Sequence, residues 1–98
     1  MVKLIVKGIA GIKVDIEDEL NIDTKKSTIK DMVEIALKLN SNLKEFFDER
    51  SMKPKPGILV LVNDVDINLI LNRSVDEILS NESSQVLELK IIPVNHGG

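Results

Sequence analysis

Apolar and polar residues alternate along the first part of the chain, which is the pattern of a half-buried β-strand. Residues 2–7 (VKLIVK) place two valines and a leucine on one face, and two lysines and an isoleucine on the other. Residues 12–16 (IKVDI) alternate in the same way, and the glycine-containing segment 8–11 separates the two runs. Two alternating runs joined by a short segment of this kind predict a β-hairpin.

The period of the apolar residues changes after residue 28 to that of an α-helix. Apolar residues then recur at spacings of three and four and form one stripe: Ile29, Met32, Val33, Ala36 and Leu37. Thr28 precedes this stripe and is followed three residues later by Asp31, so the pair is placed to form a capping box. Ser41 is placed to cap a short second helix that runs through Leu43 to Phe47.

The second half of the chain begins with residues 58–62 (ILVLV), which are apolar on both faces and predict a central strand. Residues 63–64 mark a turn, and residues 65–66 begin a short return strand. Residues 74–79 start with another capping-box pattern and predict a single helical turn. Residues 85–92 alternate again and predict the last strand.

The order of these elements predicts an α+β domain over residues 1–92, with a mixed sheet of four or five strands packed on one main helix. Leu37 on the helix and Leu61 on the central strand are expected in its core. Residues 93–98 (PVNHGG) are expected to leave the domain as a flexible tail, because proline and paired glycines do not continue a strand. Ninety-eight residues support one hydrophobic core, so we expect one domain and a monomer.

Composition narrows the classes of function. The chain has no cysteine, which excludes disulfides, thiolate metal sites and a cysteine nucleophile. A net charge of −3 and only two aromatic residues argue against direct nucleic-acid binding. No apolar run approaches the roughly 18 residues of a membrane span, and no leader cleavage site follows the first strand. We therefore expect a cytoplasmic protein without a membrane segment.

The residues that could suggest a catalytic or metal-binding site are explained more simply by other roles. His96 is the only histidine, and nothing near it in the sequence completes the three or four ligands of a metal site. Asp64 and Asp66 are interpreted as turn-forming residues, so no catalytic residue and no metal ligand is expected. The acidic residues at 15 and 17–19 are interpreted as a solvated rim, with a surface for a basic partner as the alternative.

Two segments carry a family resemblance. The segment PGILVLVNDVD at residues 56–66, together with NHGG at 95–98, resembles the ubiquitin-related modifier family, the sulfur-carrying and protein-tagging branch of the ubiquitin-like proteins. The resemblance extends over residues 54–98 and implies the β-grasp fold, in which the last strand returns beside the first. Isoleucine at position 67, where eukaryotic relatives carry tryptophan, fits an archaeal member.

The resemblance implies that this chain is a carrier and not an enzyme. A separate activating enzyme would adenylate the Gly98 carboxylate with ATP, while the chain itself binds no cofactor. Gly98 would then become a thiocarboxylate that donates sulfur through a thiolation enzyme or sulfurtransferase, as in tRNA 2-thiolation. Alternatively, Gly98 would be joined to target lysines, with the proteasome pathway as one destination. Gly97, His96 and Val94 would serve in recognition of the tail.

The face of the sheet away from the helix is the expected docking surface. The last strand divides into an apolar set (Leu87, Leu89 and Ile91) and a mixed set (Val86, Glu88, Lys90 and Ile92). If the apolar set faces the helix, then Ile5, Val86 and Ile92 lie on the open face together with one alternate set from 58–62. Apolar residues left uncovered in this way predict a partner patch.

Two alternatives stay open at the level of sequence. Pro93-Val94 is similar to the tail of the small subunit of molybdopterin synthase, which is also a sulfur carrier. From a different class, the chain would be a β-grasp interaction domain whose tail is never activated. The intact mass of the native protein separates these hypotheses, because only a carrier gains a sulfur-for-oxygen exchange.

Overall fold

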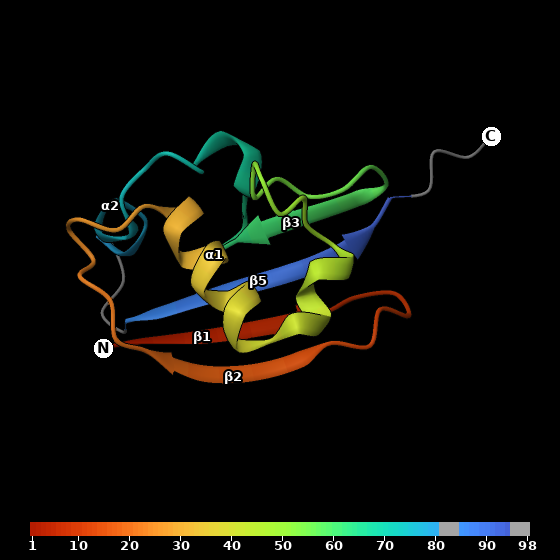
Figure 1. Cartoon of the computed structure of the whole chain (residues 1–98), viewed down its shortest axis with the longest axis horizontal. Helices are drawn as coiled ribbons and strands as arrows, with labels where there is room; N and C mark the ends of the chain where they lie inside the picture. The colour runs from red at the N-terminus through yellow and green to blue at the C-terminus, as the bar shows by residue number, and fades with distance from the viewer. Residues whose placement is uncertain (81–84, 95–98) are drawn as a thin grey trace.

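Five strands form one mixed sheet, and a single long helix lies across one face of it (Figure 1). The structure is a computed structural model that describes residues 1–80 and 85–94. The strands are β1 (Val2–Gly8), β2 (Asp15–Leu20), β3 (Ile58–Val62), β4 (Val65–Asp66) and β5 (Val86–Pro93). The helices are α1 (Ile29–Leu39) and α2 (Val75–Leu79), with 3₁₀ turns η1 (Ser41–Glu45) and η2 (Ile67–Leu69).

The strand order is β2-β1-β5-β3-β4, so the last strand of the chain lies in the middle of the sheet. β5 is parallel to β1 and antiparallel to β3, and β1 is antiparallel to β2. This topology confirms the expected α+β class and is that of a β-grasp domain. The carboxyl end of the domain therefore leaves the sheet from its centre and not from an edge.

Alternation in the strands separates a covered face from an open face. The residues of β1, β3 and β5 that face the helix are almost completely inaccessible to solvent. They are Val2, Leu4, Val6, Val60, Val62, Leu87, Leu89 and Ile91. The predicted apolar stripe of α1 packs on them, and Leu37 is buried as expected. Among the described residues no polar or charged side chain is buried. The hydrophobic effect on this one face is therefore the main source of stability.

The caps predicted at Thr28 and Ser74 are present, but the cap predicted at Ser41 was wrong, because Asn40 is the N-cap of η1 and makes no side-chain cap hydrogen bond. The Thr28 hydroxyl accepts a hydrogen bond from the Asp31 N–H at 3.1 Å, and the Asp31 carboxylate accepts one from the Thr28 N–H at 3.0 Å. Ser74 accepts from the Glu77 N–H at 3.2 Å at the start of α2. These bonds satisfy main-chain donors that have no partner inside a helix.

The prediction for the second strand was wrong in position. β2 covers residues 15–20 and not 12–16, because the chain after β1 makes a wider loop. The Gly8 N–H donates to the Val14 carbonyl at 2.8 Å, and the Ile12 carbonyl approaches Gly8 so closely that any side chain at residue 8 would collide with it. The sequence of β2 does not alternate between apolar and polar residues, because the polar Asp18 occupies an inward position. There its carboxylate accepts a hydrogen bond from the Asn40 amide at 3.0 Å.

The prediction that Leu61 lies in the core was also wrong. Val60 and Val62 take the covered face of β3, which places Leu61 half-buried on the open face. The run ILVLV is apolar on both faces, so the sequence alone could not assign its direction.

The last strand extends one residue further than expected. Pro93 lies opposite Ile58, and the Val94 N–H donates to the Gly57 carbonyl at 2.8 Å. Because successive residues of a strand direct their N–H groups to opposite sides, the nitrogen of Pro93 faces away from β3. The missing donor of proline therefore removes nothing from the β3–β5 ladder.

Candidate functional site

The candidate site is the place where the chain leaves β5. His96, Gly97 and Gly98, which the sequence predicts to carry the chemistry and its recognition, lie outside the described residues. The structure does place the residues that precede them, and these define how the carrier end is presented. β5 is held by β1 on one side and by β3 on the other almost to its end.

Val94 is the last described residue, and its main chain is fixed. Its N–H donates to the Gly57 carbonyl at 2.8 Å, while its side chain remains 38% exposed. Gly57 has φ +84°, a left-handed conformation that glycine adopts without strain, in the turn that precedes β3. The exit is thus a rigid anchor that carries an accessible apolar side chain.

Apolar residues surround this exit on the open face of the sheet. Leu59 lies opposite Ile92 in the β3–β5 ladder, and Leu61 lies opposite Lys90. Ile9 joins β5 through the hydrogen bond from its N–H to the Ile91 carbonyl at 2.9 Å. We call the apolar group around the exit the exit patch: Ile9, Leu59, Leu61, Ile92 and Val94. Each member is half-buried or exposed, so its surface is available to a partner.

The predicted partner patch of Ile5, Val86 and Ile92 lies on the open face but is not one cluster. Ile5 is opposite Glu88, which makes it a diagonal neighbour of Val86. Ile92 lies six residues further along β5, a distance of about 20 Å at the usual rise of a strand. The structure therefore brings Ile5 and Val86 together and places Ile92 in the exit patch. Leu59 and Leu61 are the alternate set of residues 58–62 that faces outward, a choice that the sequence left open. Ile9 was missed, because only the strand register reveals its place beside β5.

A row of ion pairs separates the two apolar groups. Lys7 Nζ lies 3.6 Å from the Glu88 carboxylate, and Lys90 Nζ lies 3.7 Å from the same residue. Lys90 Nζ also lies 3.3 Å from the carboxylate of Asp64. Exposed pairs of this type add little stability. They do give the centre of the open face a mixed charge between two apolar regions.

Asn63 and Asp64 explain much of the sequence pattern that suggested the family. Both have positive φ, +46° and +69°, and form the tight turn between β3 and β4. The Asn63 side chain then accepts from the Glu88 N–H at 2.8 Å and donates to the Val86 carbonyl at 3.1 Å. The side-chain amide of Asn63 thus makes the hydrogen bonds to β5 that main-chain groups would make if β3 continued. The Asp66 carboxylate accepts from the Asn68 N–H at 2.9 Å, so both aspartates act in local structure.

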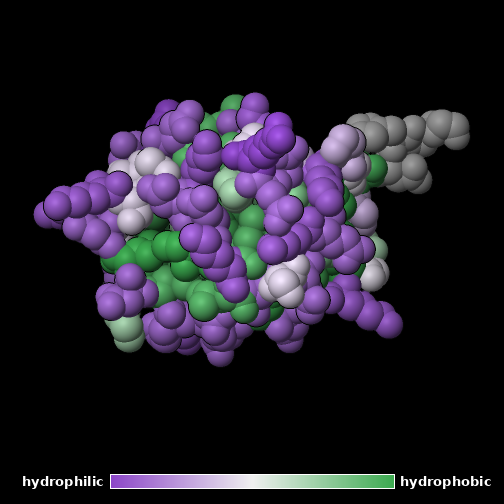
Figure 2. Space-filling model, viewed as in Figure 1, coloured by the Kyte–Doolittle hydropathy of each residue, from purple (hydrophilic) through white to green (hydrophobic). Residues whose placement is uncertain are grey.

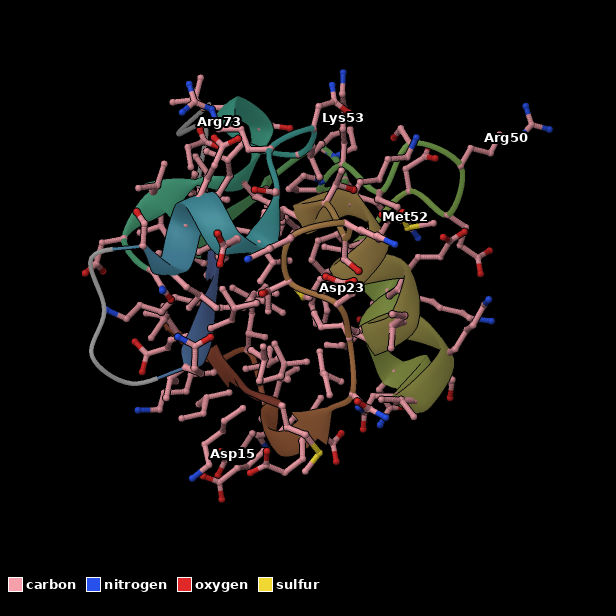
Figure 3. All side chains as sticks on the ribbon, turned by 90° about the vertical axis from the view of Figure 1, so that its left-hand side faces the viewer. Asp15, Asp23, Arg50, Met52, Lys53 and Arg73 are labelled. Carbon is pink, nitrogen blue, oxygen red and sulfur yellow. The ribbon has the colours of Figure 1, made fainter. Side chains whose placement is uncertain are left out.

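The remaining candidate features do not assemble reactive groups. The pKa of Asp48 is lowered, mainly because its carboxylate accepts hydrogen bonds from the N–H groups of Ser51 and Arg50 in an exposed loop. Figure 3 shows the Arg50 side chain extending into solvent. No group of three metal-ligating residues occurs within residues 1–80 and 85–94. No helix in the described part of the chain is long and apolar enough to cross a membrane.

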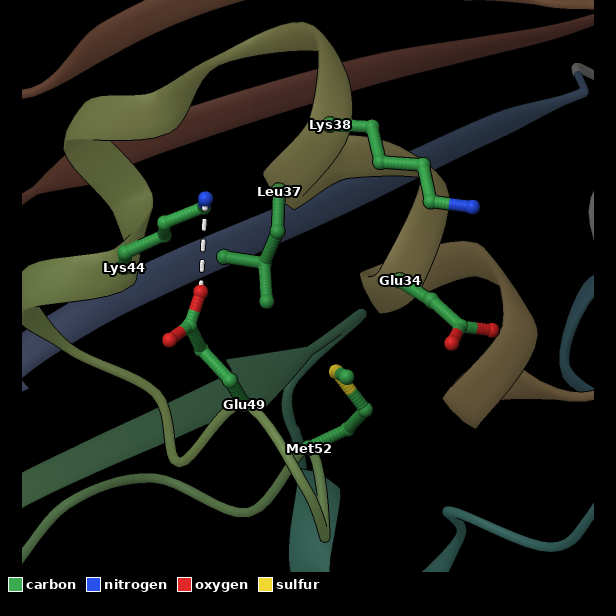
Figure 4. A pocket seen from close by; sticks show the side chains of 6 residues that line it. All are labelled: Glu34, Leu37, Lys38, Lys44, Glu49 and Met52. Atoms are coloured by element: carbon green, nitrogen blue, oxygen red, sulfur yellow. Dashed lines mark ion pairs between the residues drawn. The ribbon is translucent and has the colours of Figure 1, made fainter.

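One hollow lies beside α1, away from the exit patch (Figure 4). Leu37 and Met52 form its apolar floor, and a Lys44–Glu49 ion pair of 3.3 Å closes one rim. Glu34 and Lys38 complete the lining from α1. The hollow is thus a surface depression with an apolar floor and charged side chains of both signs around it.

Comparison with models of known protein families gives one match. Residues 2–98 match the family described as Urm1 (Ubiquitin related modifier). A comparison with curated proteins finds no match. The family match spans both the β-grasp domain and residues 95–98, so it extends well beyond the C-terminal half on which the resemblance was first based.

Proposed function

Because the chain belongs to the ubiquitin-related modifier family, we propose that it works in the cytoplasm as a carrier whose Gly98 carboxylate is adenylated by an activating enzyme. Members of this family are ubiquitin-like modifiers and sulfur carriers and are not themselves enzymes. Family membership also implies an activating partner of the ubiquitin-activating type. ATP is the substrate of that partner, and this chain supplies the acyl group.

The chemistry follows from the weakness of a carboxylate as an electrophile. A Gly98 oxygen attacks the α-phosphorus of ATP, pyrophosphate leaves, and an acyl adenylate forms. The terminal sulfur of a persulfide on a sulfurtransferase then attacks the acyl carbon, AMP leaves with the bonding electron pair, and an acyl disulfide forms. A second thiol of the partner attacks the inner sulfur of that acyl disulfide, so the S–S bond breaks, a disulfide forms within the partner, and the thiocarboxylate is released. The thiocarboxylate carries sulfur to an acceptor such as a tRNA uridine. Attack by a lysine amine forms an isopeptide bond instead, and the conjugate can enter the proteasome pathway.

The single observation that supports this proposal is the fixed exit beside an apolar patch. Four residues follow Val94, and an extended chain of four residues spans at most about 14 Å. The nucleotide site of the activating enzyme must therefore come within that distance of Val94, so the enzyme has to contact the surface around the exit. The exit patch is the apolar surface at that position, and we propose it as the contact surface; it includes Ile92 of the patch expected from sequence.

The residues beyond Val94 suit passage into an enclosed site. Gly97 and Gly98 have no Cβ, so they fit a narrow channel and adopt conformations that other residues cannot. His96 precedes them and is assigned to contact with the activating enzyme. All three follow the last strand in the sequence, so their replacement is expected to affect activation and not folding.

The test is formation of the acyl adenylate by the activating enzyme and ATP, followed by mass spectrometry of the carrier. We expect the wild-type chain to gain the mass of AMP, and chains that lack Gly98 or carry an added alanine after it to gain none. The melting temperature of both variants should match that of the wild type. Normal adenylate formation by the alanine-extended chain would contradict the proposal.

Sulfur transfer and protein conjugation are distinguished by what happens after activation. A shift in intact mass by one sulfur-for-oxygen exchange identifies the thiocarboxylate. Species of higher mass on a denaturing gel, resistant to thiols, identify isopeptide conjugates. The role of a dedicated small subunit of molybdopterin synthase predicts the first result without the second. A non-activated interaction domain predicts neither.

A further inference from the structure

The outer edge of β2 has main-chain groups without a strand partner. Within the described part of the chain, β2 pairs only with β1 and forms one margin of the sheet. The Gly8 N–H donates to the Val14 carbonyl, and alternate residues of an antiparallel strand bond to the same neighbour. The N–H and C=O groups of Asp15, Glu17 and Glu19 therefore point outward. A six-residue edge of this kind is a template for another strand.

The side chains along this edge select the charge of a partner. Asp15, Glu17 and Glu19 are exposed on the open face, and Figure 3 shows Asp15 at the margin of the molecule. The strand that pairs with the inner edge of β2 has lysines at matching positions. In β1, Lys3 lies opposite Glu19 and Lys7 lies opposite Asp15. Lys3 Nζ also lies 3.2 Å from the Glu17 carboxylate. A second strand with the same alternation would meet the same carboxylates from the outer side.

An apolar surface lies beside this edge on the helix side of the sheet. Ile35 and Leu39 are one turn apart on α1, and they lie about 160° around the helix from Leu37, which faces the hollow of Figure 4. Leu39 is 56% exposed. The bond from the Asn40 amide to the Asp18 carboxylate holds this end of α1 against β2. Figure 2 shows a band of apolar surface on the side of the molecule that carries α1.

We propose that the free edge of β2 binds an extended basic segment of a partner protein by strand addition. In this arrangement, apolar residues of the segment pack toward Ile35 and Leu39, and its alternate lysines or arginines face Asp15, Glu17 and Glu19. Main-chain hydrogen bonds to the edge supply affinity, and the alternation supplies specificity. A second copy of this chain does not fit, because pairing of two β2 edges would oppose like charges.

This surface is separate from the one used for activation. β2 lies two strands from β5, which is about 10 Å at the usual strand spacing, and β1 intervenes. A partner can therefore hold the carrier by β2 while Gly98 reacts elsewhere. The proposal stands independently of the chemistry at Gly98, since it depends only on the described edge, its carboxylates and the adjacent helix.

The experiment is a titration of the ¹⁵N-labelled full chain with synthetic six-residue peptides, followed by amide NMR. The probe is Val-Lys-Leu-Lys-Val-Lys, and the controls are Val-Glu-Leu-Glu-Val-Glu and the scrambled Val-Val-Leu-Lys-Lys-Lys. We expect the probe alone to shift the amide signals of Asp15, Glu17 and Glu19 and to slow their hydrogen exchange. Equal shifts with the scrambled peptide, or shifts confined to other surfaces, would overturn the proposal.

Two variants make the assignment specific. Glu17→Lys should weaken probe binding about tenfold, because one favourable cross-strand pair becomes repulsive. Glu34→Lys makes the same charge change on an exposed residue of α1 that faces the hollow of Figure 4, and it should leave binding unchanged. Leu39→Asp should also weaken binding, with the amide spectrum showing an intact fold. Equal effects of Glu17→Lys and Glu34→Lys would reduce the interaction to net charge and refute strand addition. Concentration-dependent dimerisation of the free chain through β2 would refute the choice of partner.

Discussion

The covered and open faces of the sheet are made by the same strands but have opposite compositions. On the covered face, Leu4, Leu87 and Leu89 are almost completely inaccessible and pack beneath α1. On the open face, a row of ion pairs divides two groups of half-buried apolar residues. The comparison shows that the same strands place apolar residues in two different environments. Those beneath the helix stabilise the domain, and those around the exit are the ones that we propose to contact a partner.

Truncation of one leucine on each face is the strongest test of this difference. Leu89→Ala on β5 should lower the free energy of unfolding by about 3 kcal/mol, because it leaves a cavity in a packed core. The matched variant Leu61→Ala on β3 should lower it by about 1 kcal/mol, because solvent already reaches this side chain. Urea unfolding measures both values. Equal losses would show that the open face is as tightly packed as the covered one.

A charge introduced at the exit should separate binding from stability. Val94→Asp is expected to weaken the apparent affinity for the activating enzyme by about 30-fold, equivalent to about 2 kcal/mol of lost apolar burial in the complex. Its melting temperature should stay close to that of the wild type. Ile5→Asp makes the same change in the other apolar group of the open face and serves as the control. If calorimetry shows equal effects of the two variants, the enzyme does not distinguish the exit patch.

The turn between β3 and β4, and its attachment to β5, depend on Asn63. Asn63→Ala removes two side-chain hydrogen bonds to β5. It also leaves alanine at a positive φ, which asparagine tolerates better than alanine does. We therefore expect the free energy of unfolding to fall by about 2 kcal/mol. Asn63→Gly removes the same hydrogen bonds but relieves the backbone, and it should be about 1 kcal/mol less damaging. Thermal or urea unfolding of the pair therefore divides the role of Asn63 into bonding and conformation. Identical losses would mean that the backbone conformation contributes nothing.

The ion pairs of the open face should have the smallest effect. Glu88→Gln breaks the link between Lys7 and Lys90, yet the free energy of unfolding should change by no more than about 0.5 kcal/mol. The difference should shrink further as salt is added, since exposed charges are screened. Denaturation at low and high ionic strength makes the measurement. A loss that is large and independent of salt would assign these pairs a structural role.

Local patterns predicted most of the elements, because their causes lie close together in the sequence. The stripe of α1 and the caps at Thr28 and Ser74 depend on residues three or four positions apart. The division of β5 into covered and open residues followed from simple alternation. The position of β2 was not predictable in this way, since a polar Asp18 in an inward position is explained only by Asn40, 22 residues away.

The candidate site was only partly predictable for the same reason. Its apolar members come from three segments of the chain, and only the pairing of β5 with β3 and β1 brings them together. The sequence correctly placed Ile5, Val86 and Ile92 on one face, but it contained no measure of the distance between them. The roles of Gly98, Gly97 and His96 remain predictions, based on chemistry and on family membership.

The central position of β5 also has a mechanical consequence. In the proposed conjugate through Gly98, a force applied to the attached molecule would be transmitted to the last residues of β5. Because β1 and β5 are parallel neighbours over six residue pairs, pulling the two ends of the chain apart loads their hydrogen bonds in shear, so that many must break together and not one after another. We expect the domain to resist extension strongly in single-molecule stretching through its termini. A carrier built in this way would remain folded while the protein attached to it is pulled apart.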